Sequence, residues 1–173
     1  MKINVSSLWI GVLLCSVGII AGAVRAETVP LIKIAVFDFE LEDYSAGGGV
    51  IGETPDDVAQ LRRATDEARQ LLAQSGRYTL VDVSQADGEP VKAKSLRMCG
   101  GCEADIAQKI GAEQSFVGVV ARSSRTEYAV GFQIRDARNG SLLFKRQTEL
   151  RMGTNDSWNR GVIRLIKNTL LDN

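Results

Sequence analysis

No histidine occurs among the 173 residues of the chain. Without an imidazole, the protein has neither a Ser-His-Asp or Cys-His nucleophile system nor a histidine-ligated metal site. The sequence also lacks an excess of either charge, because its 21 basic and 21 acidic residues cancel. A nucleic-acid-binding domain usually carries a basic excess, so this composition argues against a nucleic-acid partner. These absences favour a protein without enzymatic activity and leave carboxylate or thiol chemistry as the catalytic options.

Long apolar runs are absent too, with one exception near the N-terminus. Residues 8–23 are apolar, follow Lys2, and are fewer than the roughly 20 residues that span a bilayer comfortably. Residues 24–26, VRA, offer small side chains at the −3 and −1 positions of a signal-peptidase site. We therefore predict a signal peptide over residues 1–26 and a single globular α/β domain over residues 27–173. The mature protein would be periplasmic and without a transmembrane segment. An uncleaved N-terminal anchor is the alternative interpretation.

Cysteine is scarce, and after loss of Cys15 with the signal peptide it would be confined to Cys99 and Cys102 in the stretch CGGC. Glu103 follows where a c-type haem needs histidine, and two cysteines do not complete a zinc site, so we expect no metal and no cofactor. An oxidising compartment favours a disulfide that fixes the chain locally. The alternative is thiol-disulfide exchange, which a helix start after the motif supports. The carboxylates of Glu103 and Asp105 oppose it, because they disfavour a thiolate.

A glycine-rich loop follows the first predicted strand. Gly47, Gly49 and Gly52 match the dinucleotide-binding pattern G-x-G-x-x-G, between a strand and a helix. The match is weak, because residues 40–46 precede it at the strand end and three of these seven residues are acidic, which would repel a pyrophosphate. The other interpretation is a loop in which glycines serve the backbone. We keep the segment 40–53 as a weaker candidate for binding a small ligand or a divalent cation.

Two acidic side chains end the first predicted strand, where open α/β sheets place ligands. Strand side chains alternate, so Asp38 and Glu40 are expected on the same face of the sheet. Such a pair could act as general acid and base or hold a divalent cation. The alternative is a solvated acidic rim. No residue elsewhere in the sequence supplies a matching nucleophile.

Hydrophobic periodicity predicts the order β-α-β-α-β-β-β-α. The fold class is α/β (α+β), with helices packed on a single mixed sheet, because helical connections favour parallel strands and the last three strands form a meander. Thr54 is the expected N-cap of the first long helix, Val58 belongs to its apolar stripe, and Gly76 closes it. The dipeptide 139–140, Asn-Gly, predicts a type I′ hairpin turn. The expected strands are 32–40, 78–83, 115–121, 127–136 and 142–151, and the long helices are 55–75 and 157–171.

The final helix begins in a dense polar segment, RMGTNDSWNRG, at residues 151–161. Trp158 is a candidate for the core, for a packing contact at the helix start, or for a partner-binding anchor. Arg160, two residues later, is the accompanying candidate for partner contact.

Several segments together resemble a family of exported bacterial proteins known as a domain of unknown function. They are IAVFDFELEDYS, the CGGC followed by ADIAQKIGA, VGVVARSS, QIRDARNGSLL and GTNDSWNRGVIRLI, within residues 31–171. The opening and the element order are also similar to the N-terminal domain of TolB and to the periplasmic domain of CsgG-type proteins. These resemblances imply an α/β domain that works in the envelope through protein contacts, and they assign no catalytic residue. The expected function is an accessory or protein-binding module whose partner is another envelope protein.

Overall fold

A computed structural model describes residues 30–172 of the chain, apart from residues 51, 125 and 152–156. The predicted signal peptide and its cleavage site lie outside these residues. None of the described helices is long and apolar enough to cross a membrane. The elements are β1 (Ile32–Val36), β2 (Glu40–Asp43), α1 (Pro55–Gln74), β3 (Tyr78–Val81), η1 (Val83–Gln85), α2 (Glu89–Lys92), η2 (Leu96–Met98), α3 (Cys102–Lys109), β4 (Gln114–Arg122), β5 (Glu127–Asp136), β6 (Leu142–Arg151), α4 (Ser157–Ile166) and η3 (Lys167–Leu171).

One mixed sheet organises these elements, which confirms the predicted fold class. Its order is β3-β1-β4-β5-β6, and β2 also pairs with β4. β1 runs parallel to β3 and β4, and β2 runs parallel to β4, whereas β4, β5 and β6 form an antiparallel meander. Long helical connections cross over between the parallel strands, and short loops join the antiparallel strands of the meander, as each type of pairing requires.

The first predicted strand is interrupted, which the sequence pattern did not indicate. β1 pairs with the start of β4, and β2 pairs with its end. Between them, the Phe39 N–H donates to the Thr65 hydroxyl of α1 at 2.9 Å, and the Arg69 guanidinium donates to the Val36 carbonyl. Helix α1 thus satisfies the backbone groups that the sheet leaves unpaired. The Phe39 ring lies over Gly118, where any Cβ would overlap it.

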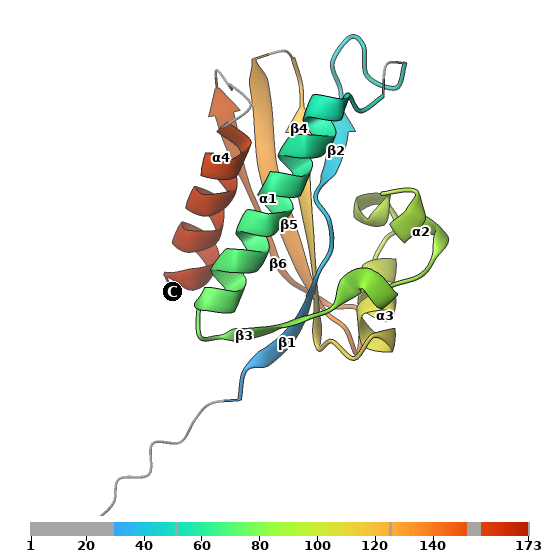
Figure 1. Ribbon diagram of the computed structural model, residues 1–173, viewed down its shortest axis with the longest axis vertical. Helices are drawn as coiled ribbons and strands as arrows, with labels where there is room; N and C mark the ends of the chain where they lie inside the picture. Colours follow the sequence, from blue (N-terminus) through green and yellow to red (C-terminus); the bar gives the residue numbers. More distant parts are fainter. Residues whose placement is uncertain (1–29, 51, 125, 152–156, 173) are drawn as a thin grey trace, which may run out of the picture.

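Two apolar cores lie on opposite faces of the sheet. Helices α1 and α4 lie side by side across one face, whereas α2 and α3 gather away from them (Figure 1). The larger core joins α1 and α4 to the sheet, and the smaller joins α3 and η2 to Ala35, Phe37 and Val117. Burial on both faces explains why the second half of β1, residues 34–36, is apolar. The prediction for Val58 was wrong, because its side chain is 36% exposed.

Local signals at the ends of α1 are confirmed. The Thr54 hydroxyl accepts from the Asp57 N–H, and the Asp57 carboxylate accepts from the Thr54 N–H, which forms a capping box. Gly76 follows the helix with φ +68°. These contacts fix where α1 begins and ends, and so position the glycine-rich loop that precedes it.

The hairpin between β5 and β6 is present, but its turn is not the predicted type I′. A type I′ turn needs positive φ at both central residues. Here Gly140 has φ +69° and Asn139 does not have a positive φ. The Gly140 N–H donates to the Asp136 carbonyl, and the Asp136 N–H donates to the Ser141 carbonyl. The loop is therefore longer than the two residues of the Asn-Gly signal.

Candidate functional site

The stretch CGGC forms a corner between η2 and α3. Cys99 and Cys102 form a disulfide bond, and Cys102 is the first residue of α3. Gly100 and Gly101 have φ values of +71° and +119°, which only glycine adopts without strain. A side chain at Gly101 would also contact the guanidinium of Arg135, 3.8 Å from a Cβ placed there. The two glycines between the cysteines are thus explained by backbone geometry.

A buried carboxylate lies behind this disulfide. The Glu103 side chain is fully buried, and its Oε1 accepts from Gln133 Nε2 and from Arg135 Nε, each at 2.8 Å. Its Oε2 lies 3.4 Å from the Cys99 sulfur. Sequence reasoning treated Glu103 only as a charge that opposes a thiolate. The burial of Glu103 could have been predicted from its position three and four residues before Ile106 and Ala107, because residues at this spacing share a helix face and both are buried.

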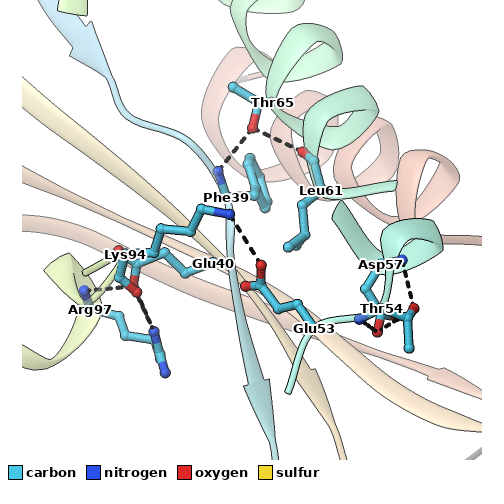
Figure 2. Close-up of polar contacts among 9 residues, drawn as sticks. All are labelled: Phe39, Glu40, Glu53, Thr54, Asp57, Leu61, Thr65, Lys94 and Arg97. Atoms are coloured by element: carbon cyan, nitrogen blue, oxygen red, sulfur yellow. Dashed lines mark hydrogen bonds and ion pairs between the residues drawn. The ribbon is translucent and has the colours of Figure 1, made fainter. Parts of the chain in front are cut away.

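Glu40, a candidate ligand or acid-base group, is held by backbone and guanidinium donors. Its carboxylate is 2% exposed and accepts from Leu96 N at 2.7 Å, Arg97 N at 3.1 Å and Arg97 Nη1 at 2.8 Å. Figure 2 shows Glu40 and Arg97 facing each other beside the Lys94–Glu53 ion pair. Glu40 therefore fastens η2 to β2, with its oxygens already occupied.

Asp38 does not share a site with Glu40. Its side chain is 72% exposed and pairs with Arg69 of α1 at 3.0 Å. Because the strand is interrupted between β1 and β2, the simple alternation that would put both carboxylates on one face does not hold. The two acids bind different arginines, on α1 and at η2 respectively.

The glycine-rich loop borders a cavity with a volume of about 760 Å³. Gly47 and Gly52 line this cavity, whereas Gly49, with φ +76°, does not. The charged groups at the cavity are Asp43 and Arg122. Its lining consists of Asp43, Ser45, Ala46, Gly47, Gly52, Thr54, Arg122, Ser123, Ser124 and Tyr128.

The two charged residues of this lining, Asp43 and Arg122, form an ion triad with Asp57. Arg122 donates to Asp43 at 2.6 Å and to Asp57 at 2.9 Å. The hydrogen bond from Arg122 lowers the pKa of Asp43 to about 2, and the hydrogen bond to Asp43 raises the pKa of Arg122. One guanidinium thus occupies both carboxylates, so the triad offers little charge to a further ion.

The two residues proposed for partner contact differ in exposure. Trp158 is 1% exposed and packs against Tyr128, with 5.4 Å between the ring centroids. Its side chain belongs to the core and is not accessible to a partner. Arg160, two residues after Trp158 on α4, is exposed.

A part of the sheet opposite α1 and α4 is not covered by a described helix. We define the open sheet face by Val119, Ala121, Ala129 and Gly131, which are half-buried and lie opposite one another on β4 and β5. A hollow of about 230 Å³ lies there. Sequence reasoning did not identify this face, although small residues alternate with large ones along β5. Long polar side chains edge the hollow: Glu42, Arg97, Gln133, Lys145, Arg146 and Gln147.

Solved structures show where this fold occurs elsewhere. The chain is similar to the LpoB C-terminal domain from Salmonella enterica, with 17% identity, a TM-score of 0.50, and coverage of 73% of this chain and 88% of that one. It is also similar to TolB from Acinetobacter baumannii, with 14% identity and a TM-score of 0.47, over 82% of this chain and 29% of TolB. A PelC dodecamer from Paraburkholderia phytofirmans matches with 16% identity and a TM-score of 0.44, over 79% and 84% of the chains. At 17% identity, the likeness to the LpoB domain shows a shared fold alone.

Sequence comparison supplies the family. None of the curated proteins compared matches the chain. The resemblance to a domain of unknown function is confirmed, because residues 32–170 match the family DUF3280, described as "Protein of unknown function (DUF2380)". This match spans both cores, the disulfide corner and the open sheet face. The chain therefore belongs to the DUF3280 family.

Proposed function

We propose that the protein is an exported, periplasmic accessory module that binds another envelope protein through the open sheet face. The resemblance of its sequence to TolB and CsgG-type domains, which act in the envelope by protein contacts, supports this assignment. The acid-base candidate Glu40 also supports it, since its carboxylate is held by the Arg97 guanidinium and by two backbone N–H groups.

The observation that carries the proposal is the composition of the open sheet face. Ala121 lies opposite Ala129, and Val119 lies opposite Gly131. Small side chains let a partner approach the strands closely, and the polar rim of Arg97, Glu42, Lys145 and Gln147 can orient it. No described helix covers this face, and its charged side chains lie only at the rim, which suits a transient protein contact better than a reaction centre.

A photocrosslinking experiment tests this surface. A photoreactive residue at Gln147, which lies opposite Gly131 on β6, should give one discrete adduct in the intact envelope. The same residue at Arg63, exposed on α1, should give none. Replacing Ala129 by glutamine in the Gln147 protein should abolish the adduct, because the larger side chain fills the face. An adduct of equal yield from both positions, or none from Gln147, would refute the assignment.

The cavity at the glycine-rich loop favours a second candidate function, the binding of a small polar ligand, whereas the pairing of Asp43 with Arg122 disfavours the divalent cation that the sequence also suggested. Its hydroxyl groups, from Ser45, Ser123 and Ser124, could contact a polar ligand. A ligand that binds only the folded protein raises the melting temperature. Thermal melts with calcium, magnesium or nucleotides test the idea, and melting temperatures unchanged at millimolar additions would reject it.

A further inference from the structure

The two oxygens of the buried Glu103 carboxylate differ in their partners. Oε1 accepts two hydrogen bonds, from Gln133 and Arg135, whereas Oε2 faces the Cys99 sulfur at 3.4 Å. A sulfur in a disulfide carries no hydrogen and cannot donate. Within the described residues, Oε2 therefore has no hydrogen-bond donor while Cys99 and Cys102 are joined. Buried polar atoms in this state are rare and costly.

Reduction of the disulfide would supply the missing donor. A Cys99 thiol carries one hydrogen, and two acceptors lie in reach of its sulfur: Glu103 Oε2 at 3.4 Å and the Leu96 carbonyl at 3.2 Å. Glu103 is held in place by Arg135 and Gln133, independently of the cysteines. The surroundings of Cys99 are thus better matched to a thiol than to a disulfide sulfur.

The two cysteines lie in different electrostatic environments. Cys102 is the first residue of α3, where the free N–H groups and the helix dipole favour a thiolate. Cys99 lies beside the Glu103 carboxylate, which favours the protonated thiol. Both cysteines are half-buried, and the neighbouring Met98 and Gly100 are exposed, so the disulfide is not sealed inside the protein.

We infer that Cys99 and Cys102 form a reversible redox couple that exchanges with a protein dithiol, with Glu103 accepting the hydrogen bond of the Cys99 thiol in the reduced form. A substrate thiolate attacks the Cys102 sulfur and forms a mixed disulfide. The Cys99–Cys102 bond breaks, its electron pair passes to the Cys99 sulfur, and Cys99 takes up a proton and donates to Glu103 Oε2. The second substrate thiolate then attacks the substrate sulfur of the mixed disulfide, and Cys102 leaves as a thiolate that is protonated from solvent. Two electrons and two protons pass to the protein, and the substrate dithiol becomes a disulfide.

Equilibration in glutathione buffers tests this inference. The fraction of reduced protein is measured by acid quenching, thiol alkylation and mass spectrometry. The wild-type protein should populate both forms across ordinary ratios of reduced to oxidised glutathione. Glu103→Gln should shift the equilibrium about tenfold toward the disulfide, which is about 30 mV for a two-electron couple. The matched control is Asp105→Asn, because Asp105 is exposed in the same helical turn, and it should shift the equilibrium about twofold or less.

Two outcomes would overturn the inference. Wild-type protein that stays oxidised in every glutathione buffer would mark a structural disulfide. Equal shifts in Glu103→Gln and Asp105→Asn would mean that any acidic charge in the first turn of α3 has the same effect.

An infrared measurement keeps the test decisive if Glu103→Gln does not fold. In Cys102→Ala, Cys99 is the single thiol of the CGGC corner. A hydrogen bond to a carboxylate lowers and broadens the S–H stretching band relative to that of a solvated thiol. A band at the solvated position would refute the contact with Glu103.

Discussion

Removal of the Glu40 carboxylate should destabilise the protein by about 3 kcal/mol, because it would leave the buried Leu96 N–H without an acceptor and break the ion pair with Arg97. The Leu96 N–H would lose its acceptor at 2.7 Å, and the Arg97 guanidinium would lose its close ion pair at 2.8 Å. Breaking a buried pair costs about 3–5 kcal/mol. We take the lower end of that range because the Arg97 side chain is 20% exposed and also donates to the Lys94 carbonyl.

Urea denaturation of Glu40→Ala measures this loss, and Glu42→Ala is the matched control on the same strand. Glu42 lies 3.9 Å from the Arg97 guanidinium and its side chain is 30% exposed, so its removal should cost less than about 1 kcal/mol. Glu40→Gln should fall between the two, because the amide keeps one acceptor and loses the charge. If Glu40→Ala unfolds at the same urea concentration as Glu42→Ala, the carboxylate does not fasten η2 to the sheet.

Three further predictions concern other parts of the fold. Thr65→Val should cost about 1–3 kcal/mol in urea titrations by leaving the buried Phe39 N–H without an acceptor, and Thr65→Ser should retain most of the stability. Gly118→Ala should lower the melting temperature, because its methyl group would overlap the Phe39 ring. In the double mutant Gly118→Ala/Phe39→Ala, the loss should be smaller than the sum of the losses in the two single mutants, and strictly additive losses would contradict the overlap. The pKa of Asp43 is lowered from 3.8 to about 2, so its pair with Arg122 stabilises the protein above pH 4 and is lost as the pH falls from 3.8 toward 2. Asp43→Asn should lose roughly 2 kcal/mol at neutral pH and show a shallower loss of stability in that acid range, and an unchanged acid profile would contradict the shift.

The local sequence pattern was sufficient to predict most helices and strands. It was insufficient where an element is shaped by a side chain that is distant in the sequence. The strands β5 (Glu127–Asp136) and β6 (Leu142–Arg151) coincide with the predicted ranges, because alternation and the Asn-Gly dipeptide are local signals. The break after β1 is not local, since it depends on the Thr65 hydroxyl, 26 residues from Phe39. A threonine at a buried position of an apolar helix stripe was the available clue. A single sequence does not show which backbone group such a hydroxyl binds.

The candidate site was harder to predict for the same reason. Trp158 and Arg160 are close in sequence, yet one lies in the core and the other in solvent, because α4 turns them toward different sides. Asp38 and Glu40 were expected together, and the interrupted strand separates them. Glu103 was regarded only as a charge that disfavours a thiolate, and it is fully buried among partners from β5. In each case the residue type was visible in the sequence and its partner was not.

The acids of this chain show how structural carboxylates can be separated from reactive ones. The Asp57 carboxylate accepts from Thr54 and Arg122, and that of Glu40 accepts from two backbone N–H groups and Arg97. Each of these has both oxygens occupied, so it has no oxygen free for chemistry. Glu103 is equally buried but has one oxygen that faces a sulfur instead of a donor. A protein selected for stability alone would be more stable with an N–H donor to Glu103 Oε2, or with an apolar side chain in place of Glu103. Glu103 Oε2 instead receives a hydrogen bond only when Cys99 is a protonated thiol. The stability of the CGGC corner is thereby linked to its redox state.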